Sequence, residues 1–137
     1  METRTSPAPD RRHTASGAAQ PKARPEAVSW MNALVDYVRS GQPDLTNRQM
    51  ALLLVAYMRP GPHTVRGLAR ELNVSKPVIT RALNRLGALG YLRRQRDQND
   101  KRNIFIAQTS EGADFLEEFG QLIGDTQQSA GRGRTDA

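Results

Sequence analysis

The sequence predicts one mainly α-helical (α+β) domain with helices at both ends and a single β-hairpin in its C-terminal half. Apolar residues recur at three- and four-residue steps over five segments, which is the period of amphipathic helices. Two short strand-like runs, 91–95 and 103–107, flank a wholly polar turn segment, 96–102. The 137 residues suffice for one hydrophobic core but not for two.

The two ends of the chain differ from the rest in composition. Residues 1–24 are rich in Pro, Ala, Ser, Thr and Arg, and residues 129–137 are also poor in apolar side chains. So few apolar groups cannot offset the entropy lost on ordering. We therefore expect two disordered tails around one domain of residues 25–128.

The terminal segments of this domain predict two amphipathic helices. The first covers residues 26–40, where Trp30 and Tyr37 flank the apolar stripe as either ordinary core or a subunit contact. The last begins at Thr109 or Ser110 and runs to about residue 127, weakened by two glycines. Residues 46–49 form a capping box that opens the second helix.

The middle of the chain predicts two helices joined by a tight turn. Thr64 caps a helix that ends at Leu72, and Asn73 suits a left-handed turn residue. Ser75 then caps a second helix, 75–87, with Pro77 in its first turn. Helix, turn, helix and hairpin is the order of a winged helix-turn-helix domain, whose second helix lies in the DNA major groove.

The outward face of helix 75–87 is polar and basic, because its apolar side chains are committed to the core. It comprises Lys76, Pro77, Thr80, Arg81, Asn84 and Arg85. We expect Arg81 to read a base, because a guanidinium pairs bidentately with guanine. Ser75, Lys76 and Thr80 lie near the helix start, where phosphate or a base edge meets the positive end of the dipole. Arg85 is expected to contact phosphate, and Pro77 is expected to serve only in helix initiation. For Arg81 and Arg85 the alternative is a solvated helix face with salt bridges.

The polar hairpin tip, residues 95–103, is the second candidate DNA contact. Arg96, Lys101 and Arg102 project from a loop narrow enough for a minor groove, which attracts arginine where it is narrow. Asp97 and Asp100 are expected to act internally, either by holding an arginine or by forming Asx-type turns. A mobile charged loop is the alternative interpretation.

Charge and composition narrow the function classes. The net charge of +6 divides into +7 over residues 26–108 and −4 over residues 109–137, with the remaining +3 before residue 26, and this asymmetry favours a surface that faces a polyanion. The absence of cysteine excludes disulfides and thiolate metal sites, and no cofactor is expected. The longest apolar run, 50–58, is too short to cross a membrane, so we expect a cytoplasmic protein. With DNA as its expected partner, it would be associated with the nucleoid.

Two other functions fit the sequence less well than DNA binding. His13 and His63 have no nucleophile or metal-ligand neighbour in the sequence, so we do not expect an enzyme. A winged helix used for protein contact is the stronger alternative, since a fold does not fix its function. The cations of helix 75–87 and of the hairpin tip favour double-stranded DNA.

The chain resembles the MarR family of bacterial transcription regulators over about residues 45–120. The resemblance rests on LTNRQ (45–49), LARELNVSKPVITRALNRL (68–86), GYLRR (90–94) followed by Asp97 and DKR (100–102), and TSEG (109–112). It implies a palindromic operator and recognition positions at Ser75, Lys76, Pro77, Thr80 and Arg81. It also implies that Arg102, partnered by Asp100, enters the minor groove.

The same resemblance implies a homodimer joined through the terminal helices, and a small-molecule effector in some members. The expected dimer contacts are Trp30, Leu34, Tyr37, Phe115 and Phe119. The sequence departs from the family pattern in two ways. Gln108 replaces an apolar residue and is expected to loosen the exit from the hairpin, and the terminal helices look short, which predicts a small interface.

Overall fold

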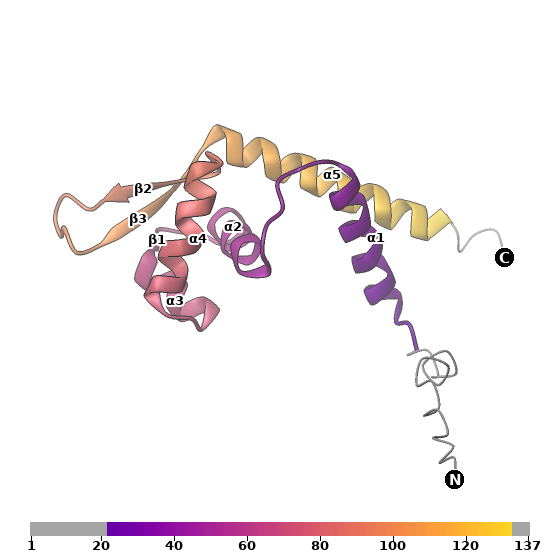
Figure 1. Ribbon diagram of the computed structural model, residues 1–137, viewed down its shortest axis with the longest axis horizontal. Coiled ribbons are helices and arrows are strands. Elements are labelled where there is room, and N and C mark those ends of the chain that lie inside the picture. The colour runs from indigo at the N-terminus through magenta and orange to yellow at the C-terminus, as the bar shows by residue number, and fades with distance from the viewer. Residues whose placement is uncertain (1–21, 133–137) are drawn as a thin grey trace, which may run out of the picture.

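The structure, a computed structural model, describes the backbone of residues 22–132 and the side chains of residues 22–124 (Figure 1). Within that range lie five helices and a three-stranded antiparallel sheet. In chain order they are α1 (Pro25–Arg39), α2 (Asn47–Met58), β1 (His63–Thr64), α3 (Val65–Leu72), α4 (Lys76–Ala88), β2 (Leu92–Arg96), β3 (Ile104–Gln108) and α5 (Ser110–Arg132). Most of the two predicted tails lies outside the described residues.

The core of the domain is shared by α2, α3, α4 and the sheet, and it extends to α1 and α5 through Tyr37, Phe115 and Leu116. Its most deeply buried side chains are Leu52, Leu53, Leu68, Ile79 and Leu86. The strand order is β1-β3-β2, with the hairpin register running from Leu92 opposite Gln108 to Arg96 opposite Ile104. The hairpin extends away from the helices as a wing (Figure 1).

Local sequence signals set most element boundaries. The capping box is present, with Thr46 and Gln49 exchanging side chain to backbone hydrogen bonds, and Thr64 caps α3 by accepting from the Gly67 N–H at 2.9 Å. Asn73 adopts the predicted left-handed conformation at φ 54°. The prediction for Ser75 needs correction: it occupies the N-cap position of α4, but its side chain makes no capping hydrogen bond.

The strand β1 was not predicted, and the last helix is longer than predicted. β1 has two residues, and His63 pairs with Ile106 of β3. α5 runs without interruption for 23 residues, so Gly120 and Gly124 lie inside it rather than breaking it. The terminal helices are therefore not both short.

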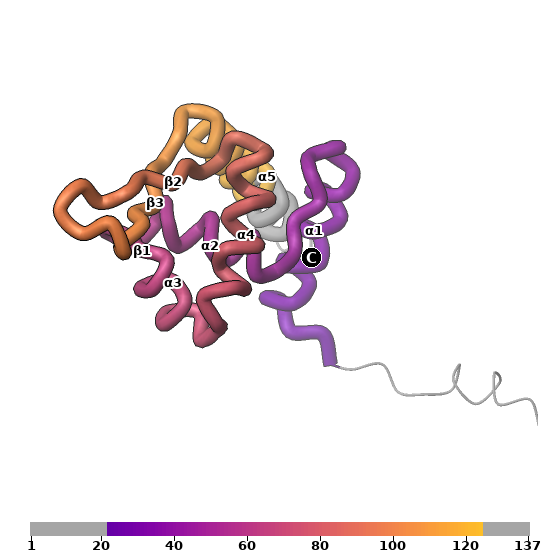
Figure 2. Tube along the Cα trace, turned by 60° about the vertical axis from the view of Figure 1, so that its left-hand side comes forward, coloured from indigo at the N-terminus to yellow at the C-terminus, as the bar shows by residue number. Residues whose placement is uncertain are grey.

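The helices α1 and α5 pack against each other on the side of the molecule away from the wing (Figures 1 and 2). Tyr37 makes edge-to-face contacts with Phe115 and Phe119, at ring-centroid distances of 6.2 and 5.9 Å. Its hydroxyl donates to the Pro43 carbonyl. Burial is the main cause that raises the pKa of Tyr37, so the phenol stays a neutral donor at ordinary pH.

The predicted dimer contacts divide into two groups. Tyr37 and Phe115 are only 7% and 5% exposed, so they belong to the core of their own chain, and their expected role in a subunit contact stays a prediction. Phe119 is half-buried beside them. Trp30 and Leu34, at 54% and 46% exposure, are not core residues. Tyr37 is thus ordinary core, and a subunit contact at Trp30 stays a prediction.

A compact joint connects the winged part of the molecule to α5. The Tyr57 hydroxyl lies 2.8 Å from the Tyr91 carbonyl oxygen and accepts from the Thr109 N–H at 2.9 Å. The Thr109 hydroxyl accepts from the Gly112 N–H, which makes Thr109 the cap of α5. A Cβ at Gly112 would collide with the Tyr57 hydroxyl and the Tyr91 carbonyl, so only glycine fits.

Gln108 strengthens the exit from the wing instead of loosening it. Its side-chain amide donates to the Ala56 carbonyl at 3.2 Å, which ties the end of β3 to α2. An apolar residue would lack this hydrogen bond. The expectation drawn from the family pattern is therefore corrected at this position.

Candidate nucleic-acid interface

The structure places the predicted recognition residues on the exposed side of α4 or at its N-terminus. These exposed residues are Ser75, Lys76, Pro77, Thr80, Arg81, Asn84 and Arg85. The opposite side of the helix is buried through Ile79, Ala82, Leu83 and Leu86. Among the described side chains, no carboxylate forms an ion pair with Lys76, Arg81 or Arg85. The basic face is thus not neutralised by the acidic residues of α5 that are described.

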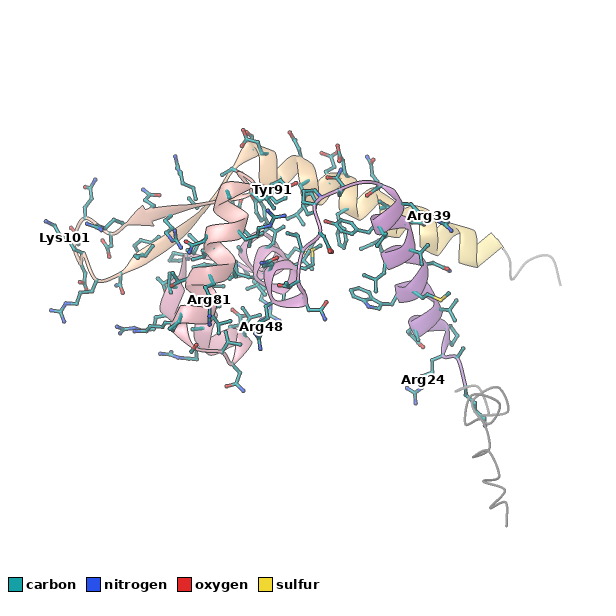
Figure 3. The ribbon with its side chains drawn as sticks, in the orientation of Figure 1. Arg24, Arg39, Arg48, Arg81, Tyr91 and Lys101 are labelled. Carbon is teal, nitrogen blue, oxygen red and sulfur yellow. The ribbon has the colours of Figure 1, made fainter. Side chains whose placement is uncertain are left out.

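A polar hollow lies between α4 and the N-terminus of α2. It has a volume of about 270 Å³ and is lined by Thr46, Arg48, Gln49, Val78, Arg81 and Ala82. Figure 3 shows Arg48 and Arg81 on the same side of the molecule. Sequence reasoning missed Arg48. The capping box indicates that a helix begins here, but it does not indicate that α4 lies beside it.

Arg94 of β2 was also missed, and it contacts α4 directly. One of its guanidinium nitrogens, Nη2, donates to the Thr80 carbonyl at 3.0 Å and to Asn84 Oδ1 at 2.6 Å. The alternation of strand side chains gave a usable signal, because Leu92 faces the core and Arg94 follows it by two residues. Asn84 is exposed as predicted, but its amide oxygen is already engaged.

The wing presents its three predicted cations to solvent. Arg96, Lys101 and Arg102 are exposed, and Lys101 lies at the outer end of the hairpin (Figure 3). The two aspartates shape the turn. Asp97 accepts from the Asn99 N–H at 2.9 Å in an Asx-type arrangement.

Asp100 combines the two roles that the sequence left open. Its Oδ1 accepts from the Arg102 N–H at 3.1 Å and lies 4.0 Å from the Arg102 Nε. The Arg102 side chain remains 91% exposed, so this ion pair holds it loosely. Arg66 and Arg70 on the exposed side of α3 add two further cations that sequence reasoning did not single out.

The described part of the chain offers no candidate for two other kinds of site. No group of three or more His, Asp or Glu side chains in that part is placed to hold a metal ion. None of the helices described has the length and apolar character required to span a bilayer.

The fold and this surface define a winged helix-turn-helix protein. Residues 44–103 match the family model described as MarR family. This match agrees with the resemblance that the sequence motifs indicated.

The chain is also similar to known transcription regulators and their solved structures. The chain is 29% identical over 104 residues to the HTH-type transcriptional regulator YwhA of Bacillus subtilis, covering 71% of this chain and 73% of that protein. It is 26% identical to the transcriptional regulator Tm0710 from Thermotoga maritima, with a TM-score of 0.62 and coverage of 74% and 68%. It is 27% identical to reduced AbfR bound to DNA, with a TM-score of 0.56 and coverage of 71% and 66%.

Proposed function

We propose that this protein is a transcription regulator that binds double-stranded DNA in a sequence-specific manner. Helix 75–87 would lie in the major groove and the wing, 95–103, in the minor groove. The observation that carries the proposal is the exposed face of α4, whose cations have no carboxylate partner among the described side chains. The solved structure of AbfR with DNA supports the choice of partner.

The exposed residues divide into readers and anchors. Arg81 would pair with a guanine, and Lys76 and Thr80 lie nearer the start of the helix. Arg48 adjoins Arg81 across the hollow and is suited to a flanking phosphate, as is Arg85. Arg102 would enter the minor groove, with Asp100 shaping the turn that presents it.

We also propose that the protein binds as a homodimer through the outer side of α1. Apolar side chains cover this side, and monomeric soluble proteins rarely expose contiguous apolar patches of this kind. The exposed apolar residues of α1 are Val28, Trp30, Met31, Leu34, Val35 and Val38. A two-fold symmetric dimer would present two α4 helices to a palindromic operator.

This proposal includes a cytoplasmic location at the nucleoid and no enzymatic activity. The relatives reported above are transcription regulators, and they lend no support to a module for protein contact alone. Selection of bound duplexes from a random pool tests the proposal most directly. We expect an enriched palindrome and a steep salt dependence of affinity, with a log–log slope of about −0.9 per phosphate neutralised. Failure to enrich any motif would overturn it.

A further inference from the structure

We propose that Arg94 is a positioning residue that sets the base preference of Asn84. The inference deepens the proposed function and rests on it. Arg94 lies on the wing strand β2 and is not itself on the recognition helix, yet it donates to both Thr80 and Asn84 of α4. It would fix the orientation of the Asn84 amide before DNA arrives.

The orientation of the amide follows from the chemistry of its partner. A guanidinium has donors and no acceptor, so the Asn84 oxygen and not its NH₂ group must face Arg94. The second hydrogen bond, to the Thr80 carbonyl, anchors the guanidinium against the helix backbone. The group of Asn84 that is left to meet a base is therefore its NH₂, a donor.

A fixed donor discriminates between bases in the major groove. Guanine offers two acceptors there and thymine one, whereas an asparagine recognises adenine by accepting from N6 and donating to N7 at once. The Asn84 oxygen has a second lone pair, but a base amino group approaching it would lie beside the guanidinium charge. Asn84 would thus favour guanine, which offers two acceptors, over adenine, whose single acceptor N7 lies beside the N6 donor.

The neighbouring arginine provides a matched control. Arg93 precedes Arg94 on β2, is exposed, and points to the other face of the strand because side chains alternate. Substitution of either arginine removes one positive charge from the same strand. A difference between the two variants then reports the contact with Asn84 and not the charge.

The test measures base preference at each operator position for the wild-type protein and for the Arg94→Met, Arg93→Met and Asn84→Ala variants. We expect the wild type to favour guanine over adenine at one position, and Asn84→Ala to lose that preference. In Arg94→Met the amide is free to rotate, so adenine should gain relative to guanine there by about fivefold or more. Arg93→Met should keep the wild-type preference.

The double variant Arg94→Met/Asn84→Ala separates positioning from a general structural effect. If Arg94 acts through Asn84, the double variant should show the same base preferences as Asn84→Ala alone. The inference is overturned if adenine is already preferred by the wild type, if Arg94→Met leaves the preference unchanged, or if Asn84→Ala affects no position. The absence of any selected motif in the wild type would instead contradict the proposed function.

Discussion

Two surfaces of the molecule are exposed but carry opposite kinds of side chain. The first is the face formed by α4 together with the wing, and the second is the outer side of α1. The first presents arginines, lysines and amides that solvent hydrates well. The second presents a tryptophan, a methionine, a leucine and three valines. Cations are well hydrated in the free protein and gain binding free energy from a polyanion. Exposed apolar area gains free energy only when another apolar surface covers it.

The difference separates the two functions that we propose for the chain. One surface is built for an ionic partner whose binding depends on salt, and the other for a partner that excludes water. The helix α5 spans both regions, because its start is held at the Tyr57 joint and its later turns pack on α1 (Figure 1). Changes in one region and in the other should therefore affect different measurements.

The largest expected effect is on assembly. Leu34→Glu places a charge on the apolar side of α1, where burial against a second copy would leave it without a partner. We expect the dimer to dissociate at micromolar concentration, a loss of about 3 kcal/mol or more of association free energy. Analytical ultracentrifugation measures this directly.

Gln121→Glu is the control for the dimer prediction, because it adds the same charge at an exposed polar position of α5. It should leave the association constant close to that of the wild type. A wild-type protein that sediments as a monomer would contradict the assignment of α1 to the interface.

The joint between the two regions should be the most sensitive point for folding. Gly112→Ala introduces a Cβ where the Tyr57 hydroxyl and the Tyr91 carbonyl already lie, so the first turn of α5 must move. We expect destabilisation of up to about 3 kcal/mol in denaturant unfolding.

A second glycine of the same helix gives the opposite expectation. A Cβ added at Gly120 would meet no atom within 4 Å, so Gly120→Ala should stabilise the protein by about 0.5–1 kcal/mol. Equal effects of the two substitutions would show that the contacts at Gly112 do not constrain α5.

The contrast also explains which parts of the molecule the sequence could predict. The exposed face of α4 follows from helical periodicity, because the apolar positions that repeat at the right spacing turn inward. Caps such as Thr46 and Thr64 are local and were predicted correctly. These features depend on residues only a few positions apart.

Features that depend on distant neighbours were missed, left open or predicted wrongly. Periodicity marked Trp30 and Tyr37 as apolar positions of one helix, but only the packing of α5 buries Tyr37 and leaves Trp30 exposed. Gly120 and Gly124 each cost about 1 kcal/mol relative to alanine, yet they do not end a helix that packs on α1. Arg94 and Arg48 gain their significance only from the helix beside them.

On the basic face, the largest expected effect is on specificity. Arg81→Ala removes the guanidinium expected to read a guanine and should reduce discrimination between operator and random DNA by about 1–3 kcal/mol. Weak binding to any duplex should largely remain, because the other exposed cations are unchanged. Competition binding at fixed salt measures the ratio, and an unchanged ratio would contradict the base-reading role.

The smallest expected effect is that of Arg48, which adjoins Arg81 but is assigned to phosphate. Arg48→Gln should weaken binding to operator and random duplexes alike and reduce the salt slope by about 0.9, the value for one phosphate contact. Arg39→Gln is the control, because it removes a cation from α1, on the terminal-helix side of the molecule (Figure 3). If both variants leave the slope unchanged, the interface ends at α4, and if Arg48→Gln changes the base preference, Arg48 is a reader and not an anchor.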